Sequence, residues 1–451
     1  MWFKAAALFP FVSFLASAAP TGVSQGSVWP QYDAIVVGGG PAGLSALSAL
    51  ARVRRKALLI DSNEYRNAPT RHMHDVVGFD GVTPAYFRWA ARQKLEHYET
   101  VSAKNGTVID IQPRQNNTHF EVSVEETGAT YTYTARKIIL ATGMRDIIPN
   151  TEGLRENFGK GIFWCPWCDG MEHAGQRVGI LASSFANALD SLAGLSTLNT
   201  GITILADGKD TEKNRKEADQ KFGNTTAYLE LRRATVENRT IKAIERLKDG
   251  HNPNQDPSLP TAPEHDLFRI HFEGEKKEYV DRDALFVNFG AEQRSRIHEL
   301  LQLKMGEENK IWVNQATLET NMTGVYAVGD ANSGGSTNVP HALFSGKRAG
   351  VKIHYKLERE DRELVIPPYS TPSTSSPAST STSASSSASS SASASALPLP
   401  LPSHPSSTPP EKEKVESKDD SGEQDEFEDE DDIWAQIKDD LLEDEQHRLY
   451  L

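Results

Sequence analysis

A glycine-rich loop between an apolar strand and a helix constrains the fold of this chain more than any other feature. Residues 33–37 predict a buried strand, and the run from Leu44 to Arg52 predicts a helix. The spacing G-x-G-x-x-G between them is typical of a turn that brings a pyrophosphate onto the helix N-terminus. The dinucleotide-binding residues expected in this turn are Gly38, Gly39, Gly40, Pro41, Ala42 and Gly43.

A second strand with an acidic end supports the same interpretation. Residues 56–60 are largely apolar and are followed by Asp61, which lies 18 residues after Gly43. This is close to the spacing of the carboxylate that binds the ribose of a dinucleotide. The sequence therefore predicts an α/β domain with a parallel sheet and a dinucleotide at its carboxyl edge.

Two later motifs indicate which dinucleotide is bound. The strand 136–140 runs into Ala141, Thr142 and Gly143, and the strand 324–328 runs into Gly329 and Asp330. In this order the motifs resemble the two-dinucleotide-binding flavoproteins. The resemblance implies FAD as cofactor, with Thr142 and Gly143 at the exit from the FAD domain and Gly329 and Asp330 at the ribityl and phosphate groups. The alternative for Asp330 is a turn residue.

The chain has only two cysteines, Cys165 and Cys168, three positions apart. A disulfide between them closes too small a loop to restrict the unfolded chain much, so the pair indicates redox chemistry. A zinc site would need two more Cys or His ligands at fixed spacing, and His173 is the only near neighbour. We therefore expect no metal, and we expect His173 to be a surface or hydrogen-bonding residue.

The order of these motifs resembles low-molecular-weight thioredoxin reductase along residues 32–357. The resemblance implies that Cys165 attacks the substrate, that Cys168 faces the flavin, and that Asp169 is the adjacent acid or base. It also implies that the start of the last helix, with His341, faces the flavin. His341 is then a candidate catalytic residue, and the alternative is a helix-capping or core histidine.

The second dinucleotide site of a reductase is degenerate here. The stretch 182–187 lacks the glycine pattern, and Asp207 and Asp210 stand where that family has arginines for the 2′-phosphate. This departure resembles the fungal thiol and dithiol oxidases derived from thioredoxin reductase, including secreted sulfhydryl oxidases and gliotoxin-type enzymes. The resemblance also implies that Arg66 and His74 lie at the FAD.

We therefore expect an FAD-dependent oxidation of small-molecule or protein thiols through the cysteine pair, with O2 as acceptor and H2O2 as product. Two alternatives remain open. One is an NAD(P)H-dependent disulfide reductase that binds its nucleotide atypically. The other, of a different class, is a non-catalytic cell-wall module on a serine-rich stalk.

The N-terminal residues predict export of the chain, and the C-terminal residues predict a solvated tail. Lys4, the apolar run 5–16 and the small residues that follow are typical of a signal peptide over 1–18, and five N-x-S/T sequons fit a secreted protein. The alternative is an uncleaved anchor, although the run is shorter than a membrane span. After cleavage we expect no membrane span.

Residues 368–410 are almost entirely Ser, Ala, Pro and Thr, which predicts a disordered linker. The tail 411–451 has 18 acidic and 5 basic residues, so its charge of −13 accounts for nearly all of the net −14 of the chain. This distribution argues against nucleic-acid binding. Plain disorder and a short amphipathic helix around Trp434 are both open for the tail.

Taken together, these motifs predict two three-layer dinucleotide-binding-like domains. The FAD domain is split into 31–150 and 286–367, and the degenerate domain with the cysteine pair, 151–285, is inserted between the halves. The family resemblance also implies a homodimer.

Overall fold

The computed structural model describes residues 29–252, 261–274 and 278–366, and all of them belong to one compact unit that ends at Ile366. The predicted signal peptide 1–18, linker 368–410 and tail 411–451 lie outside the described residues. Within the described ranges, no helix combines the length and the apolar character needed to cross a membrane.

A sheet of seven strands carries the glycine-rich loop. Its order is β3-β2-β1-β6-β5-β4, and β17 pairs with β6. β1 pairs in parallel with both β2 and β6, so that Ile35 lies opposite Leu58 and Ile138. The strands are β1 (Tyr32–Val37), β2 (Ala57–Asp61), β3 (Val101–Asn105), β4 (Thr107–Arg114), β5 (His119–Glu126), β6 (Ala129–Leu140) and β17 (Val325–Ala327).

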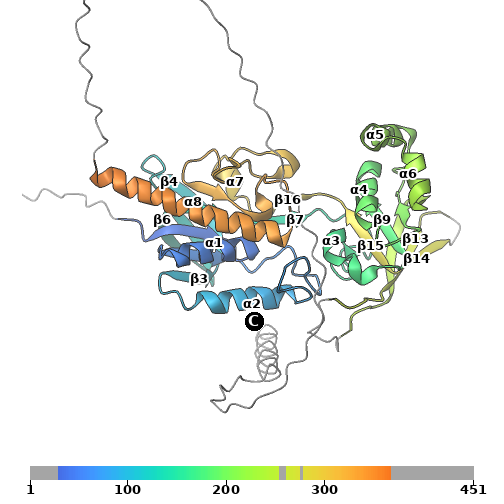
Figure 1. Ribbon diagram of the computed structural model, residues 1–451, viewed down its shortest axis with the longest axis horizontal. Helices are drawn as coiled ribbons and strands as arrows, with labels where there is room; N and C mark the ends of the chain where they lie inside the picture. The colour runs from blue at the N-terminus through green and yellow to red at the C-terminus, as the bar shows by residue number, and fades with distance from the viewer. Residues whose placement is uncertain (1–28, 253–260, 275–277, 367–451) are drawn as a thin grey trace, which may run out of the picture. The chain divides into compact units, whose positions relative to one another are not determined.

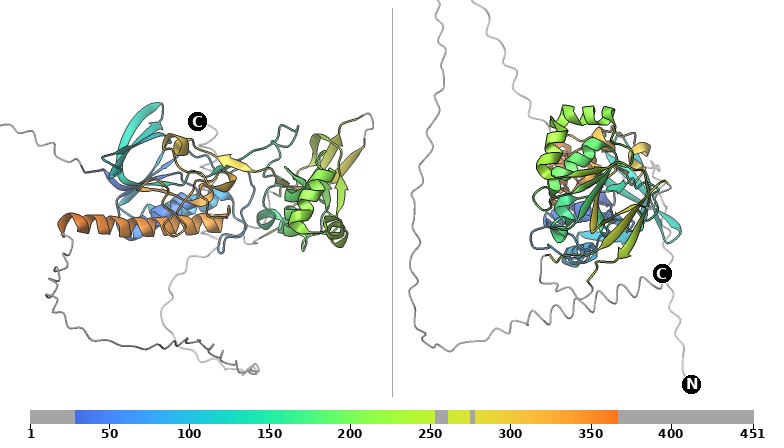
Figure 2. Two further views of the ribbon diagram at one scale, coloured as in Figure 1. Left: turned by 90° about the horizontal axis from the view of Figure 1, so that it is seen from above. Right: turned by 90° about the vertical axis from the view of Figure 1, so that its right-hand side faces the viewer.

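The long helix α8 (Val339–Val365) runs alongside α1 (Pro41–Arg52), as Figures 1 and 2 show. The two backbones approach closely, because a Cβ on Gly346 would lie 2.1 Å from the carbonyl oxygen of Ala42. α2 (Pro84–Leu95) begins at the N-cap Thr83 and also packs against α1. Apolar residues of α1, α8 and the sheet form one core.

A second, smaller parallel sheet has the order β11-β10-β9-β15-β8. Its strands are β8 (Ile162–Phe163), β9 (Val178–Ala182), β10 (Thr203–Leu205), β11 (Thr235–Glu237) and β15 (Ala284–Asn288). The helices beside it are α3 (Pro166–Asp169), α4 (Phe185–Leu195), α5 (Glu212–Phe222) and α6 (Thr225–Arg232). β15 pairs with β9 as far as Asn288, so the predicted boundary between 285 and 286 falls inside a strand and has to move beyond it.

The chain passes between the two sheets twice, and these two passages pair with each other. β7 (Met144–Asp146) and β16 (Ala291–Gln293) form an antiparallel ladder. A three-stranded antiparallel sheet consists of β12 (Ile241–Lys248), β13 (Leu267–Phe272) and β14 (Tyr279–Arg282). Short helical segments are α7 (Ile297–Leu300) and the 3-10 turns Met171–His173, Glu307–Asn309 and Gly329–Ala331. The second sheet is parallel throughout, whereas the first is mainly parallel with β4 and β5 antiparallel at one edge. With two largely parallel sheets and helices packed beside them, the predicted α/β class is confirmed.

The last turns of α8 hold a buried cation of the first sheet. Lys137 on β6 is 1% exposed, and both carboxylate oxygens of Glu360 accept from its Nζ at 2.9 Å. Burial lowers the pKa of Lys137, and Glu360 opposes that effect. The neighbouring Arg136 pairs with Asp361 at 2.7 Å. The end of α8 therefore belongs to the folded body.

These ion pairs predict where the chain can be shortened. Truncation after Ile366 should leave the midpoint of urea unfolding unchanged, because the compact unit ends there. Truncation after Glu358 should lower the free energy of unfolding by on the order of 3 kcal/mol, because Lys137 keeps its buried charge without its partner. Equal urea midpoints for the two truncated proteins would contradict this role of Glu360.

Candidate redox site and dinucleotide cavity

The glycine-rich loop joins β1 to α1 through two very close backbone approaches. Gly38 has a φ of +108°, and a Cβ placed on it would lie 2.4 Å from the carbonyl oxygen of Ala141. A Cβ on Gly43 would lie 1.9 Å from the carbonyl oxygen of Gly38. Side chains at either position would push the helix away from the sheet. Both glycines therefore allow α1 to start against the end of the parallel sheet.

Gly40, in contrast, faces open space. Apart from Gly40 and its two chain neighbours, no atom of the described residues lies within 4 Å of the position that its Cβ would take. Gly40 is the N-cap of α1, and this helix N-terminus has no side-chain cap. Its first-turn N–H groups lack intrahelical partners and can meet an anion from solvent. The loop thus leaves room for a phosphate where a side chain would otherwise stand.

A cavity of about 460 Å³ opens at this helix N-terminus. Such a volume lies within the range of ligand and cofactor sites. The cavity draws its lining from the ends of the parallel strands, from the segment after β2 and from the cysteine turn. The predicted site residues that line it are Gly38, Gly39, Gly40, Pro41, Ala42, Asp61, Arg66, His74, Thr142, Gly143, Cys168, Asp169, Gly329 and Asp330. Gly43, Cys165 and His341 are not among the lining residues.

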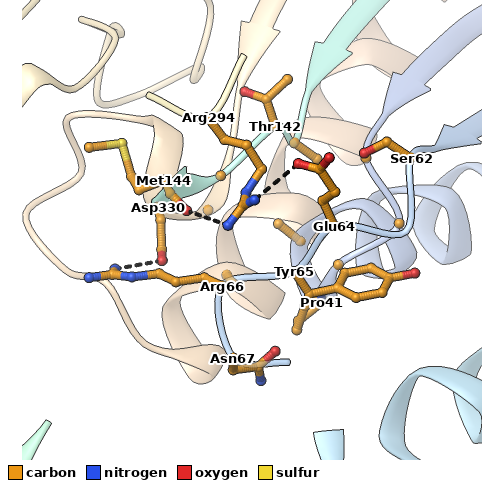
Figure 3. Close-up of a pocket in the computed structure, with 18 of the residues that line it drawn as sticks. Pro41, Ser62, Glu64, Tyr65, Arg66, Asn67, Thr142, Met144, Arg294 and Asp330 are labelled. Atoms are coloured by element: carbon orange, nitrogen blue, oxygen red, sulfur yellow. Dashed lines mark hydrogen bonds and ion pairs between the residues drawn. The ribbon is translucent and has the colours of Figure 1, made fainter. Parts of the chain in front are cut away.

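Two arginines bind two of the acidic groups that line the cavity, Asp330 and Glu64 (Figure 3). Arg66 donates to Asp330 at 2.9 Å and forms two hydrogen bonds with Asp146, at 2.6 and 2.9 Å. Burial would lower the pKa of Arg66, but the hydrogen bonds and charges of the two carboxylates outweigh it and raise that pKa. Arg294 pairs with Glu64 at 3.1 Å. Asp330 can therefore accept from a ligand hydroxyl while its charge is balanced by Arg66.

Asp61 is 1% exposed and lies against the glycine-rich loop, since a Cβ on Gly39 would lie 2.1 Å from its Oδ2. Its carboxylate is paired with Arg92, accepts from the Tyr65 hydroxyl at 2.5 Å, and accepts from the backbone N–H of Asn63 at 3.1 Å. Burial and the charge of Asp61 raise the pKa of Tyr65 to about 12. Asp61 is thus held in place at the cavity wall by its protein neighbours.

The two cysteines form a disulfide, with Cα atoms 5.2 Å apart, at the start of α3. Cys168 lines the cavity, whereas Trp167 between the cysteines is 81% exposed. The sulfur of Cys165 accepts from the backbone N–H of Cys168 at 3.1 Å. The disulfide therefore has one cysteine at the cavity, and Trp167, one of the two residues between the cysteines, faces solvent.

Asp169 follows the disulfide and is buried at the cavity wall. Burial raises its pKa well above the usual value, and the nearby Glu172 and Glu264 add to the effect. Burial likewise raises the pKa of Glu264 to about 7, although Arg71 acts against it. A buried carboxyl group beside the disulfide whose pKa is raised in this way can donate or accept a proton during thiol chemistry.

Arg71 joins the segment after β2 to the inserted region. Its guanidinium pairs with Glu264, with Asp266 at 2.9 Å and with Asp249 at 2.6 Å. His173, Glu264 and Asp266 offer ligand atoms within 4.8 Å of one another. The guanidinium already supplies the positive charge there, so the group is an arginine-centred ion-pair cluster. His173 is fully buried rather than on the surface, and its Nδ1 lies 3.0 Å from the side-chain oxygen of Gln176.

His341 lies at the start of α8, but its side chain lies beside Asn332 and Gly334 and does not line the cavity. Its Nε2 is 3.4 Å from the side-chain oxygen of Asn332, and its ring lies beside Gly334. Asn338 caps the helix by accepting from the backbone N–H of His341 at 2.8 Å. This placement corresponds to the alternative of a packed histidine near a helix terminus, since Thr337, Asn338, Val339 and Ala342 line the cavity instead.

The loop between β9 and α4 lacks the glycine pattern, and it differs from the β1–α1 loop at the N-terminus of its helix. Ser184 caps α4, because its hydroxyl accepts from the backbone N–H of Asn187 at 3.1 Å. Phe185 is buried in the core of the second sheet. The crevice beside this turn has a cavity volume of about 0 Å³. The turn therefore fills with its own side chains the space that a pyrophosphate needs.

The two acids expected to repel a 2′-phosphate are both neutralised. Asp207 pairs with Lys209 at 2.9 Å, and Asp210 pairs with Arg215 at 2.5 Å. Asp207 also accepts from the backbone N–H of Ile241 at 2.8 Å. The repulsion inferred from the sequence is therefore weaker than expected, and the filled loop is the stronger argument against a second dinucleotide.

Comparison with known proteins identifies the class. A model of the pyridine nucleotide-disulphide oxidoreductase family matches residues 32–346. The chain therefore belongs to this family, and it is an oxidoreductase of the thioredoxin reductase-like type.

Individual relatives agree. A protein described as a probable thioredoxin reductase of Arthroderma benhamiae is 42% identical over 374 residues, or 80% of this chain and 90% of the relative. A protein described as thioredoxin reductase tcpT of Claviceps purpurea is 32% identical, over 70% of this chain and 92% of the relative. The crystal structure of HlmI matches with a TM-score of 0.61 and 25% identity, over 74% of this chain and 95% of that one. The predicted thioredoxin reductase-like fold is confirmed.

The different surroundings of Gly40 and Gly43 predict different effects of the same substitution. Gly40→Ala should leave urea unfolding of the cofactor-free protein unchanged but weaken binding of the dinucleotide, because the new methyl group enters only the open space. Gly43→Ala should destabilise the cofactor-free protein by about 1–3 kcal/mol, because its methyl group meets the Gly38 carbonyl. An unchanged dinucleotide affinity in Gly40→Ala would argue against a phosphate at this position.

The raised pKa of Asp169 predicts a pH-dependent cost to stability. Between the ordinary carboxyl pKa and the raised one, the folded state holds a proton that the unfolded state has lost, so stability falls as pH rises through this window. Asp169→Asn should therefore raise the free energy of unfolding more at pH 8 than at pH 5. Asp75→Asn, at an exposed position, is the control and should show no such difference. A pH-independent effect of Asp169→Asn would be inconsistent with a buried carboxyl.

Proposed function

We propose that the protein is an FAD-dependent thiol oxidase that joins two substrate thiols into a disulfide and passes the electrons to O2. The observation that carries this proposal is the contrast between two helix N-termini of the same kind. The N-terminus of α1 is uncapped and opens into a cavity of about 460 Å³, whereas that of α4 is capped by Ser184 and has no such space beside it. This contrast supports one open dinucleotide site at α1 and argues against a nicotinamide donor at α4.

FAD fits the residues of the open site. The space beside Gly40 suits its pyrophosphate, and the carboxylates of Asp61 and Asp330 suit the ribose and the ribityl chain. Thr142, Gly143 and Gly329 complete the same wall of the cavity. When bound, FAD would take the electron pair from the reduced cysteines and transfer it to O2, giving H2O2.

In the proposed cycle, a substrate thiolate attacks the sulfur of Cys165, the disulfide breaks, and Cys168 leaves as a thiolate. A second thiolate then attacks the substrate sulfur of this mixed disulfide and releases Cys165. The substrate disulfide is formed, and both protein cysteines are reduced. Asp169 accepts and returns protons beside Cys168. With O2 as acceptor, two thiols and one O2 give one disulfide and one H2O2.

An NAD(P)H-dependent disulfide reductase is the second candidate. It is favoured by the descriptions of the relatives in Arthroderma benhamiae and Claviceps purpurea as thioredoxin reductases. Lys209 and Arg215 beside the second sheet are also cations of the kind that can bind a 2′-phosphate. In this alternative the electrons flow from the nucleotide to an external disulfide through the same two cysteines.

The proposal also includes where the enzyme acts. A signal peptide over 1–18 would export the chain, and outside the cell both O2 and exported thiols are at hand. Glutathione, protein cysteines and dithiol metabolites all carry the sulfur that Cys165 would attack. We also propose that the enzyme is a secreted homodimer.

The two candidates make opposite predictions for the flavin without oxygen. An oxidase should lose its flavin absorbance within seconds of mixing with a dithiol, but should keep it in millimolar NADPH or NADH. Stopped-flow absorbance of the purified yellow protein measures both. Cys165→Ser is the control, and it should keep its colour and resist the dithiol, because the attacked sulfur is absent.

Rapid loss of flavin absorbance with low concentrations of either nucleotide would overturn the oxidase proposal in favour of the reductase. Loss of colour with dithiol in Cys165→Ser would show that the thiols bypass the disulfide. Oxygen consumption and H2O2 release with the same dithiol then test the last step.

A further inference from the structure

We propose that His74 is a positioning residue for Cys168, and that it shares a single proton with Glu172 so that a cationic imidazole faces Cys168 when its thiolate forms. The proposal rests on the proposed function only in taking Cys165 and Cys168 as the redox pair. It assigns His74 a second task beside its place at the cavity wall.

The first observation is the contact between His74 and the cysteine turn. Nδ1 of His74 lies 2.7 Å from the carbonyl oxygen of Cys168. A carbonyl oxygen only accepts hydrogen bonds, so Nδ1 must carry a hydrogen and donate. This contact joins the segment after β2 to the flavin-side cysteine across 94 residues of sequence. The tautomer of His74 is therefore set by Cys168 itself.

The second observation concerns the other ring nitrogen. Nε2 of His74 lies 3.3 Å from Oε1 of Glu172. Because Nδ1 already carries a hydrogen, one further proton shared across this contact would have two arrangements: a neutral imidazole beside a carboxylic acid, or an imidazolium beside a carboxylate. The pair stays neutral as a whole, and only the position of the proton changes.

Glu172 is held and isolated in a way that suits proton sharing. It is 6% exposed, and its Oε1 also accepts from the hydroxyl of Thr261. Its Oε2 is buried and has no hydrogen-bond partner among residues 29–252, 261–274 and 278–366. A buried carboxylate in this state is costly unless a cation or a proton lies beside it. His74 can supply either one.

The other charged groups around His74 and Glu172 are less suited than His74 to provide a cation for a Cys168 thiolate. Asp169 and Glu264 are carboxyl groups, and each of them feels the charge of Glu172. Arg71 is engaged by three carboxylates, and His173 and His72 both have pKa values lowered by burial. Formation of a Cys168 thiolate would add another negative charge to this region. An imidazolium at His74 would stabilise that thiolate and so assist its release from the disulfide.

The test reads the acidity of Cys168 directly. The chain has two cysteines, so in a Cys165→Ser background Cys168 is the only thiol. Its alkylation by iodoacetamide, followed by intact mass between pH 5 and 9, gives the midpoint at which the thiolate forms. Adding His74→Gln should raise this midpoint by about one pH unit, which slows alkylation about tenfold below the midpoint. The readout needs neither turnover nor oxygen, so failure of the oxidase proposal leaves it interpretable.

Glu172→Gln in the same background tests the sharing of the proton. A glutamine at position 172 cannot keep the second proton on His74, so we expect the midpoint to rise by part of the same amount. A lowered midpoint would mean that Glu172 acts only as a nearby negative charge, which overturns proton sharing. Glu172 does not line the cavity, so this variant also decides the matter if His74→Gln fails to fold.

His72→Gln is the matched control. The Nδ1 of His72 faces the carbonyl of Gly81 at 2.8 Å, so the same change in the same segment leaves the Cys168 contact intact. We expect an unchanged midpoint for this variant. An unchanged midpoint in His74→Gln, or equal shifts in both histidine variants, would overturn the proposal.

Discussion

The fit between the backbones of the glycine-rich loop and α1 is the constraint on which the rest of the site depends. Gly43 packs where any Cβ would lie within 2 Å of the Gly38 carbonyl oxygen, and Gly38 itself packs against Ala141 at the end of β6. These contacts place the uncapped N-terminus of α1 at the carboxyl edge of the parallel sheet. Because strand ends and the helix start meet there, the cavity combines free N–H groups with acidic side chains.

The inserted region repeats this architecture with one decisive change. β9 leads into α4 as β1 leads into α1, but Ser184 supplies a cap that the first loop lacks. A serine cap satisfies helix N–H groups that an anion would otherwise meet, and Phe185 adds core packing at the same turn. Capping and apolar side chains thus stand in this turn where the first turn has glycines, and they stabilise the start of α4 without a bound anion.

Local patterns predicted the strand, loop and helix of the first site, because the glycine spacing and the apolar strand act over a few residues. They also predicted the carboxylates Asp61 and Asp330, but not their partners. Arg92 binds Asp61 from α2, and Arg66 bridges Asp146 and Asp330 across 80 and 264 residues of sequence. The resemblance placed Arg66 at the cofactor but not against these carboxylates, and nothing local distinguishes Arg92 from a surface arginine. Such pairs depend on tertiary packing.

The same limit explains two differences in detail. The place of His341 at the start of the last helix predicts a position at the flavin. Side chains on the first turn of a helix point in different directions, however, and the ring of His341 points toward Asn332 and Gly334. The strand β15 continues to Asn288 because its pairing with β9 continues, and no composition change marks this point in the sequence. The sequence predicts which strands and helices form, whereas the direction of a side chain and the end of a strand depend on neighbours far along the chain.

The position of the disulfide is also a long-range property. α3 has four residues, too few to hold a fixed place by helix formation alone. Its placement depends on contacts from the segment after β2, where Arg71 binds Glu264 and Asp266 and His74 binds the Cys168 carbonyl. These contacts bury several carboxylates close together. Burying charged groups in this way costs folding stability, whereas packing apolar side chains does not. Asp169, which follows Cys168 directly, feels the charge of Glu264, so this cost is concentrated close to the disulfide.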